Sequence, residues 1–223
     1  MVSSAALRFY WQPHLSRTNT VYREGKNVSC RSNIGFGLAR RSELLVQIGV
    51  RFMQLPADID ETVHSAESPD DYVSRMAVEK AQAGYGLQTG NLPVLGADTA
   101  VVCGGQIFGK PTDQDDAAYM LDQLSGATHE VLTAVAINHG DKMALRLSRT
   151  AVTFRTISAS ESLSYWQTGE PLGKAGGYAI QGMGAIFVTN IEGSYSGVVG
   201  LPIAQTEELL SLFNIPVWQT VKP

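Results

Sequence analysis

Apolar residues recur at helical or strand spacing through most of the chain beyond residue 34. Apolar positions three and four residues apart, preceded by a capping residue, predict helices. Apolar, β-branched runs bounded by glycine or polar turns predict strands. The expected helices are 40–48, one that opens at Ser68, 113–125, 158–168 and 202–213, and the expected strands are 50–55, 92–103, 106–110, 129–138, 143–157 and 185–191. Because helices alternate with strand hairpins, the pattern favours an α/β or α+β domain around a mixed sheet.

The composition is that of a folded globular protein. Of the 223 residues, 44% are hydrophobic and 17% are charged, which excludes a chain that is disordered throughout. No apolar run approaches the length of a transmembrane helix, so we expect no membrane partner. The two cysteines, Cys30 and Cys103, cannot form a disulfide framework and favour a reducing, cytoplasmic environment.

Charge divides the chain into two parts. Residues 1–33 contain five Lys or Arg against one Glu, so the acidic excess behind the net charge of −4 lies in the remainder. We expect residues 1–33 to be an atypical, poorly ordered extension and residues 34–223 to form the folded domain. An acidic domain argues against stable, nonspecific nucleic-acid binding through bulk charge.

Asp98 is the most informative polar residue in the predicted strands. It interrupts the apolar strand 92–103, where a buried carboxylate without a partner is costly. A carboxylate at such a position serves as a general base or a metal ligand. An aspartate that closes a turn or pairs with an arginine is the structural alternative, and the residues alone leave both open.

Two further positions suggest chemistry with a divalent cation and an anion. Glu61 ends the acidic loop 58–61, and its oxygens are hard ligands of the kind Mg²⁺ prefers, although a solvated acidic loop explains the same pattern. Lys80 falls on or beside the apolar face of the helix that opens at Ser68. Its ammonium there either extends to solvent or meets an anion.

The remaining candidates are basic or amide side chains suited to a phosphorylated ligand. Arg40 and Arg41 stand at the expected start of a helix, where free amides favour anions, although an exposed basic pair is the simpler explanation. Lys110 is held between a glycine and a proline at a strand end. Gln181 offers an amide donor and acceptor in a glycine-rich loop and is suited to recognise a base edge. Together these residues point to a polyanion bound with a metal.

Several motifs in consistent order resemble the Maf family of nucleoside triphosphate pyrophosphatases, also called septum-formation inhibitors. The resemblance covers about residues 40–213. The motifs include Gly96-Ala-Asp98-Thr99, Gly109-Lys110-Pro111, the helix with Arg75, Glu79 and Lys80, Lys174-Ala-Gly176, Ile180-Gln181-Gly182 and Val198-Val-Gly-Leu-Pro202.

The resemblance implies a fold, an activity and an assembly. The fold is an elongated, bent mixed sheet flanked by helices, related to the inosine triphosphatases, with a cleft between two lobes. The activity is hydrolysis of a nucleoside triphosphate to the monophosphate and pyrophosphate, assisted by Mg²⁺ or Mn²⁺, which removes noncanonical nucleotides. The family also implies a cytoplasmic homodimer.

The resemblance further implies roles for individual residues. Asp98 becomes the base that activates water and, with Glu61, a metal ligand. The triphosphate charge is neutralised by Arg41, Lys80 and Lys110. The positions that distinguish substrate subgroups are Arg40, Thr99 and Gln181. Gly-Ala-Asp-Thr and Ile-Gln-Gly are similar to the dTTP/UTP branch, whereas the alternative 7-methyl-GTP branch usually has Gly-Ser-Asp-Gln.

One departure from the family pattern lies just before the arginine pair. The family has Leu-Ala-Ser-x-Ser-Pro-Arg-Arg, whose serines help to bind phosphate. Here Phe36 and Leu38 replace the serines and Ala39 replaces the proline. The loss of these hydroxyl donors predicts impaired activity, and it keeps open a second class of function, a non-catalytic nucleotide-binding regulator of cell division.

Overall fold

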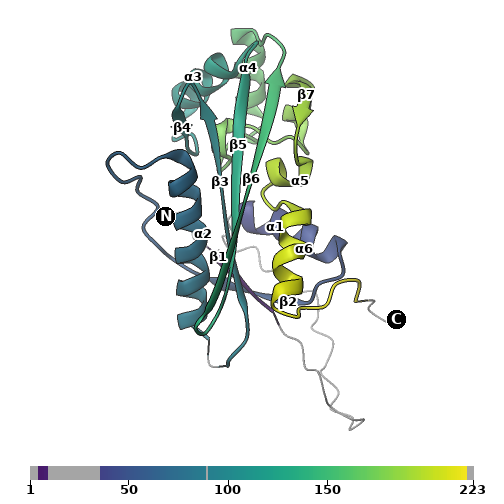
Figure 1. Ribbon diagram of the computed structural model, residues 1–223. Coiled ribbons are helices and arrows are strands. Elements are labelled where there is room, and N and C mark those ends of the chain that lie inside the picture. Colours follow the sequence, from purple (N-terminus) through teal and green to yellow (C-terminus); the bar gives the residue numbers. More distant parts are fainter. Residues whose placement is uncertain (1–4, 10–35, 89, 220–223) are drawn as a thin grey trace.

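The computed structural model describes residues 5–9, 36–88 and 90–219, which form one sheet flanked by helices (Figure 1). The strands described are β1 (Ala5–Phe9), β2 (Phe52–Pro56), β3 (Val94–Cys103), β4 (Gln106–Phe108), β5 (Thr128–His139), β6 (Lys142–Phe154) and β7 (Val188–Glu192). The helices described are α1 (Phe36–Gln47), α2 (Pro69–Gly86), α3 (Gln114–Leu124), α4 (Ala159–Gln167), α5 (Tyr195–Val199) and α6 (Ile203–Leu212), with short 3₁₀ turns at Ala175–Gly177 and Met183–Phe187.

The strand order is β2-β1-β3-β5-β6-β7, with β4 paired to β3. This confirms the predicted α/β class, but every strand pair in the described part of the chain is antiparallel rather than mixed. A short hairpin accounts for the pairing of β5 with β6. His139 pairs with Lys142 across a two-residue turn, and such a turn can only join antiparallel strands.

Helices cover both faces of the sheet (Figure 1). On one face, Val73, Ala77 and Ala81 of α2 pack against buried side chains of β3 and β5. On the other face, Leu45 of α1 and Leu209 of α6 pack against the alternate residues of the same strands. Successive side chains of a strand point to opposite faces, so both faces of β3 and β5 are buried.

A third core cluster lies at the end of the sheet near α3 and α4. It joins Leu121 and Leu124 of α3 to Phe154 of β6, Tyr165 of α4 and Phe187. Phe154 and Phe187 have ring centroids 5.9 Å apart, and Tyr165 meets Phe187 edge to face at 5.1 Å. The long strands β5 and β6 therefore connect this cluster to the helix-covered part of the sheet.

Local capping signals in the sequence are confirmed. Ser68 caps α2 by accepting a hydrogen bond from the Asp71 amide at 3.2 Å, and Ser158 forms a capping box with Glu161 at the predicted start of α4. The short helix α5 was not predicted, because glycines surround it and hide its periodicity. No helix in the described part of the chain is both long and apolar enough to cross a membrane.

Two expectations about the N-terminal region change. Part of the predicted extension, Ala5–Phe9, is strand β1, which lies between β2 and β3 with Leu7 and Phe9 buried. The rest of residues 1–33 lies outside the described residues, so the proposed boundary at residue 34 stays a prediction. Helix α1 begins at Phe36 rather than Arg40, since alanine at position 39 favours helix where the family has proline.

Candidate functional site

Gly96 permits the close contact between α2 and β3 on which the site depends. A Cβ at this position would lie 2.3 Å from the Ala77 carbonyl oxygen and 2.5 Å from the Ala81 amide nitrogen. Only glycine fits against the helix backbone at this distance. Lys80 lies one turn along α2 from Ala77, and Asp98 lies two residues along β3 from Gly96. The contact therefore brings Lys80 over Asp98.

Lys80 joins two carboxylates in a nearly buried position. Its Nζ lies 2.7 Å from Asp98 Oδ1 and 2.7 Å from Glu61 Oε1, and Lys80 is only 4% exposed. The second Glu61 oxygen, Oε2, lies 3.1 Å from Lys110 Nζ. An ammonium buried this deeply requires paired charges, so of the two alternatives for Lys80 the structure selects the anionic partner.

Helix α2 also fixes the loop that carries Glu61. The Tyr72 hydroxyl donates to the Glu61 carbonyl oxygen at 3.1 Å, and Arg75 donates to the Thr62 carbonyl oxygen at 2.9 Å. Burial, followed by the charges of Asp98 and Glu61, raises the pKa of Tyr72. Tyr72 therefore stays a neutral donor, and together with Arg75 it holds the backbone of the acidic loop against α2.

Arg41 adds a cation from α1. Its Nε donates to the Gly200 carbonyl oxygen at 2.9 Å. Burial lowers the pKa of Arg41, while Asp98 and Glu61 act in the opposite direction, so its guanidinium lies within electrostatic range of both carboxylates. Because α1 begins at Phe36, Arg40 and Arg41 lie inside the helix and not at its free amides, which corrects the predicted position of this pair.

Thr99 points to the opposite face of β3 from Asp98. Its hydroxyl lies 3.0 Å from the Thr133 hydroxyl, which donates to the Gly197 carbonyl oxygen at 2.8 Å. Thr133 has one proton and gives it to Gly197, so Thr99 is the donor to Thr133 and keeps its own oxygen lone pairs available. A Cβ on Gly200 would lie 3.6 Å from both Thr99 Oγ1 and Arg41 Nε, which places Thr99 beside Arg41.

Arg40 belongs to a second group of charges around Glu170. Burial and then the charge of Arg41 lower the pKa of Arg40 to about 10, while Glu170 acts to raise it. Burial and the charge of Arg40 lower the pKa of Lys174 to about 8, again opposed by Glu170. Gln181 is exposed on the loop whose next residues contact Glu170.

The predicted residues thus form two groups. Asp98, Glu61, Lys80, Lys110 and Arg41, the cluster we call the lysine–carboxylate cluster, come together from five segments far apart in the sequence. Arg40 and Gln181 lie instead with Glu170 and Lys174, which the sequence analysis did not propose. Glu170 and Lys174 lie in an irregular segment far from Arg40 in the sequence, so no periodicity indicated a common site.

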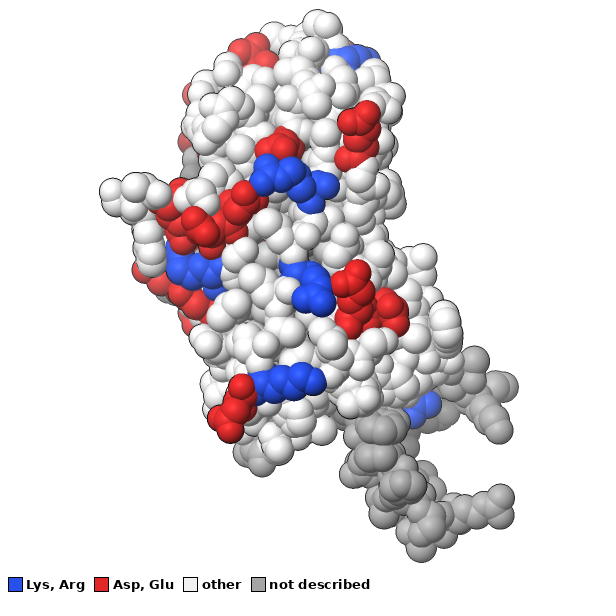
Figure 2. All heavy atoms as spheres, viewed as in Figure 1, with Lys and Arg blue, Asp and Glu red and all other residues white. Residues whose placement is uncertain are grey.

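The charges of the lysine–carboxylate cluster suit an anionic ligand with a cation. Three basic groups face two carboxylates, which leaves one net positive charge. No group of three or more His, Cys, Asp or Glu side chains that could hold a metal alone occurs among residues 5–9, 36–88 and 90–219. On the face shown in Figure 2, acidic and basic side chains of the described residues lie next to one another and form no continuous basic strip.

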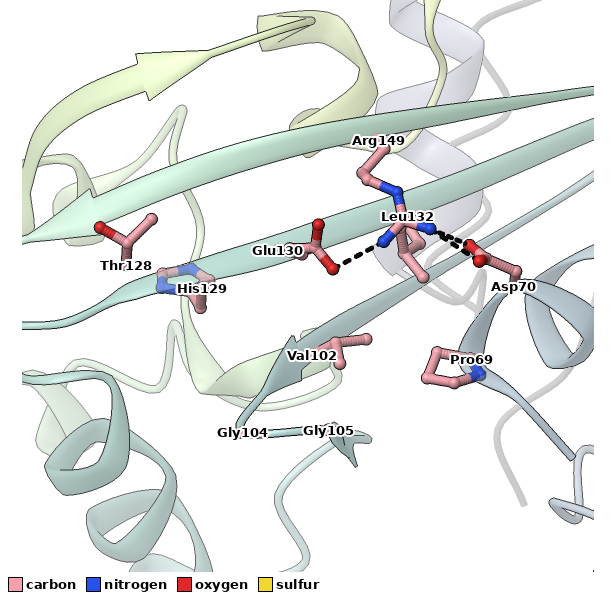
Figure 3. Close-up of a pocket in the computed structure, with 10 residues that line it drawn as sticks. All are labelled: Pro69, Asp70, Val102, Gly104, Gly105, Thr128, His129, Glu130, Leu132 and Arg149. Carbon is pink, nitrogen blue, oxygen red and sulfur yellow. Dashed lines mark hydrogen bonds and ion pairs between the residues drawn. The ribbon is translucent and has the colours of Figure 1, made fainter. Parts of the chain in front are cut away.

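A pocket of about 310 Å³ lies elsewhere, beside the Gly104–Gly105 turn (Figure 3). Its Arg149 is already paired, with Glu130 at 2.7 Å and Asp70 at 2.6 Å. None of the sequence-predicted site residues lines it. The pocket is therefore separate from the lysine–carboxylate cluster.

The fold and the cluster agree with one protein family. Residues 39–213 match the family described as Maf-like protein, and the chain belongs to that family.

Its relatives are closely similar over most of their length. The chain is 51% identical over 187 residues to a dTTP/UTP pyrophosphatase of Saccharophagus degradans, covering 82% of this chain and 89% of the relative. It is 53% identical over 179 residues to a dTTP/UTP pyrophosphatase of Pseudoalteromonas atlantica, covering 79% and 93%. A dTTP/UTP pyrophosphatase of Alcanivorax borkumensis is 52% identical over 184 residues, covering 82% and 95%.

Proposed function

We propose that this protein is an enzyme that hydrolyses dTTP and UTP to the nucleoside monophosphate and pyrophosphate. The observation that carries the proposal is the convergence of Asp98 with Lys80, Glu61, Lys110 and Arg41 in a Maf-family chain. Three relatives at 51–53% identity bear the name dTTP/UTP pyrophosphatase, which favours these substrates over 7-methyl-GTP and favours an enzyme over a non-catalytic regulator.

In the proposed reaction, Asp98 is the general base. Its carboxylate takes a proton from water as the water oxygen attacks the α-phosphorus, and the bond from that phosphorus to the bridging oxygen of the β-phosphate breaks. The electron pair leaves with pyrophosphate. Lys80 orients Asp98 through the 2.7 Å contact to Oδ1, and Lys80, Lys110 and Arg41 neutralise the charge of the triphosphate. Phosphoryl transfer depends mainly on such positioning and charge compensation.

Glu61 and Asp98 are suited to hold a divalent cation. Both carboxylates converge on the Lys80 ammonium, and Mg²⁺ is commonly bound by one or two carboxylates together with substrate phosphates. A bound Mg²⁺ or Mn²⁺ would supply charge neutralisation at the phosphate oxygens. Glu61 is held for this role by the Tyr72 hydrogen bond to its carbonyl and by Lys110.

Selection of the nucleotide is assigned to Arg40, Thr99 and Gln181. Thr99 retains an acceptor oxygen beside Arg41, and Gln181 is exposed with an amide that can donate and accept. The family resemblance supports three further parts of the proposal, which are a cytoplasmic role in removing noncanonical nucleotides, a homodimer and a link to septum formation.

Pyrophosphate release by the purified full-length protein tests the proposal. The substrates are dTTP, UTP, CTP and 7-methyl-GTP, each with Mg²⁺, with Mn²⁺ and with a chelator. We expect release from dTTP and UTP that the chelator abolishes and Mg²⁺ restores. Release from 7-methyl-GTP alone, or from no nucleotide by a folded protein, would overturn the proposal.

The Asp98→Asn variant tests the role of the base. Asparagine keeps the size of the side chain but cannot accept the proton, so we expect kcat to fall by about 10²- to 10⁴-fold with nucleotide binding retained. Asp122→Asn is the matched control, because Asp122 is exposed on α3 and its side chain contacts Gln123 and not a residue of the lysine–carboxylate cluster. Equal kcat values in the two variants would exclude Asp98 as the base.

A further inference from the structure

Glu170 holds the loop that follows Gln181. Its Oε2 accepts a hydrogen bond from the Met183 amide at 3.0 Å, and its Oε1 accepts one from the Gly184 amide at 2.9 Å. The Tyr165 hydroxyl donates to Oε1 at 2.7 Å. One carboxylate thus satisfies two backbone donors of the 182–184 loop and joins them to α4.

The fit between Glu170 and this loop leaves no room for a side chain at residue 182. A Cβ on Gly182 would lie 2.2 Å from Glu170 Oε2. The backbone of Glu170 is also held in place, because its amide donates to the Thr168 hydroxyl at 3.1 Å. The backbone immediately after Gln181 therefore has its position set by the Glu170 carboxylate.

Glu170 also acts on Arg40, the other residue of this group proposed to select the nucleotide. Its charge acts to raise the pKa of Arg40 and of Lys174, but burial outweighs it and both pKa values stay below their usual range. Burial acts to raise the pKa of Glu170 itself, but the hydrogen bonds from Tyr165, Gly184 and Met183 outweigh it and hold this pKa below its usual value. Glu170 is therefore an anion at neutral pH.

We propose that Glu170 is a positioning residue for nucleotide selection, which sets the loop that carries Gln181 through its hydrogen bonds to Met183 and Gly184. This inference rests on the proposed function, because it assigns Glu170 to the same site. Glu170 lies outside the lysine–carboxylate cluster and does not act on the phosphates. Its loss weakens recognition of the nucleoside and spares the chemical step.

The test compares Glu170→Gln, Gln181→Ala and the double variant in the pyrophosphate assay. Glutamine keeps one acceptor oxygen but loses the charge and the second acceptor. We expect the KM for dTTP and UTP to rise about tenfold in Glu170→Gln with kcat within about twofold, and the preference for dTTP over CTP to fall. In the Gln181→Ala background, Glu170→Gln adds no further change, since both act through one loop. Glu161→Gln, which alters a carboxylate at the start of α4, is the control and keeps the wild-type KM.

Each outcome decides between the two proposals. Wild-type protein that releases no pyrophosphate overturns the proposed function and this inference with it. Active wild-type protein with an unchanged KM and selectivity in Glu170→Gln, or with fully additive effects in the double variant, overturns this inference alone. If Glu170→Gln does not fold, Tyr165→Phe replaces it, because it removes the hydroxyl that donates to Glu170 at 2.7 Å. We expect a smaller increase in KM, and again no further change when Tyr165→Phe is combined with Gln181→Ala.

Discussion

His129 makes the stability of the fold depend on pH. Its ring is 2% exposed, with Nε2 at 2.9 Å from the Tyr178 hydroxyl. Phe154 and Tyr178 meet the ring edge to face, with centroids at 4.8 and 5.5 Å. Its Nδ1 is buried without a hydrogen-bond partner among the described residues. A proton added here creates a charge in aromatic surroundings, and burial accordingly lowers the pKa of His129 to about 4.

The magnitude follows from the difference between the folded and unfolded states. The ordinary pKa of histidine is 6.5, and in the fold it is about 4. Between these values the unfolded chain binds one proton more than the folded chain, so stability rises with pH. The contribution is fully present above pH 6.5, falls by about 1.4 kcal/mol per pH unit below it, and levels off below pH 4. The total loss is about 3 kcal/mol.

Urea denaturation at several pH values from 4 to 7 measures this effect in wild type and His129→Gln. Glutamine can hydrogen-bond to Tyr178 but does not titrate, so the free energy of unfolding should fall less steeply on acidification in the variant. His139→Gln, at the turn of the same hairpin, controls for the removal of a histidine. Equal slopes in wild type and His129→Gln between pH 4 and 6.5 would refute the reasoning.

Two further substitutions test the packing around the site. Gly96→Ala forces a Cβ to 2.3 Å from the Ala77 carbonyl oxygen, so it should destabilise the fold by about 3 kcal/mol in urea denaturation and reduce kcat as Lys80 shifts from Asp98. The control is Gly86→Ala, whose Cβ meets open space, and an equal loss in both variants would contradict the argument. Thr133→Val removes a buried hydroxyl that donates to the Gly197 carbonyl oxygen and contacts the Thr99 hydroxyl, and the Gly197 oxygen keeps only the Gly200 amide as a donor. The variant should lose about 1 kcal/mol of stability, and unchanged thermal unfolding would contradict this.

Local signals in the sequence predicted much of the fold. The capping residues Ser68 and Ser158 located the starts of α2 and α4, since a cap is satisfied within four residues. The interruption of an apolar strand by Asp98 identified a carboxylate that needs a partner. The identity of that partner was not predictable, because the sequence left a turn or an arginine open, and Lys80 reaches Asp98 only through the glycine contact between α2 and β3.

The features that were missed depend on contacts distant in sequence. The insertion of β1 between β2 and β3 and the antiparallel pairing of β3 with β5 have no local signature, because no short turn joins these strands. Helix α1 extends upstream of Arg40 where the family motif would have started it with proline. Glu170 gave no signal because it lies in a turn after α4, and two of its partners, Met183 and Gly184, lie in a glycine-rich segment without periodicity.

The β5–β6 hairpin has a consequence for how the protein unfolds. Its twelve paired positions run from Thr128 opposite Thr153 to His139 opposite Lys142. Val131 and Val152 belong to the core near α3 and α4, whereas Val135 and Ile137 belong to the core under α1 and α6. Neither core can open fully without breaking the same pair of strands. The described domain should melt in a single cooperative transition, with the amides of β5 among the slowest to exchange with deuterium.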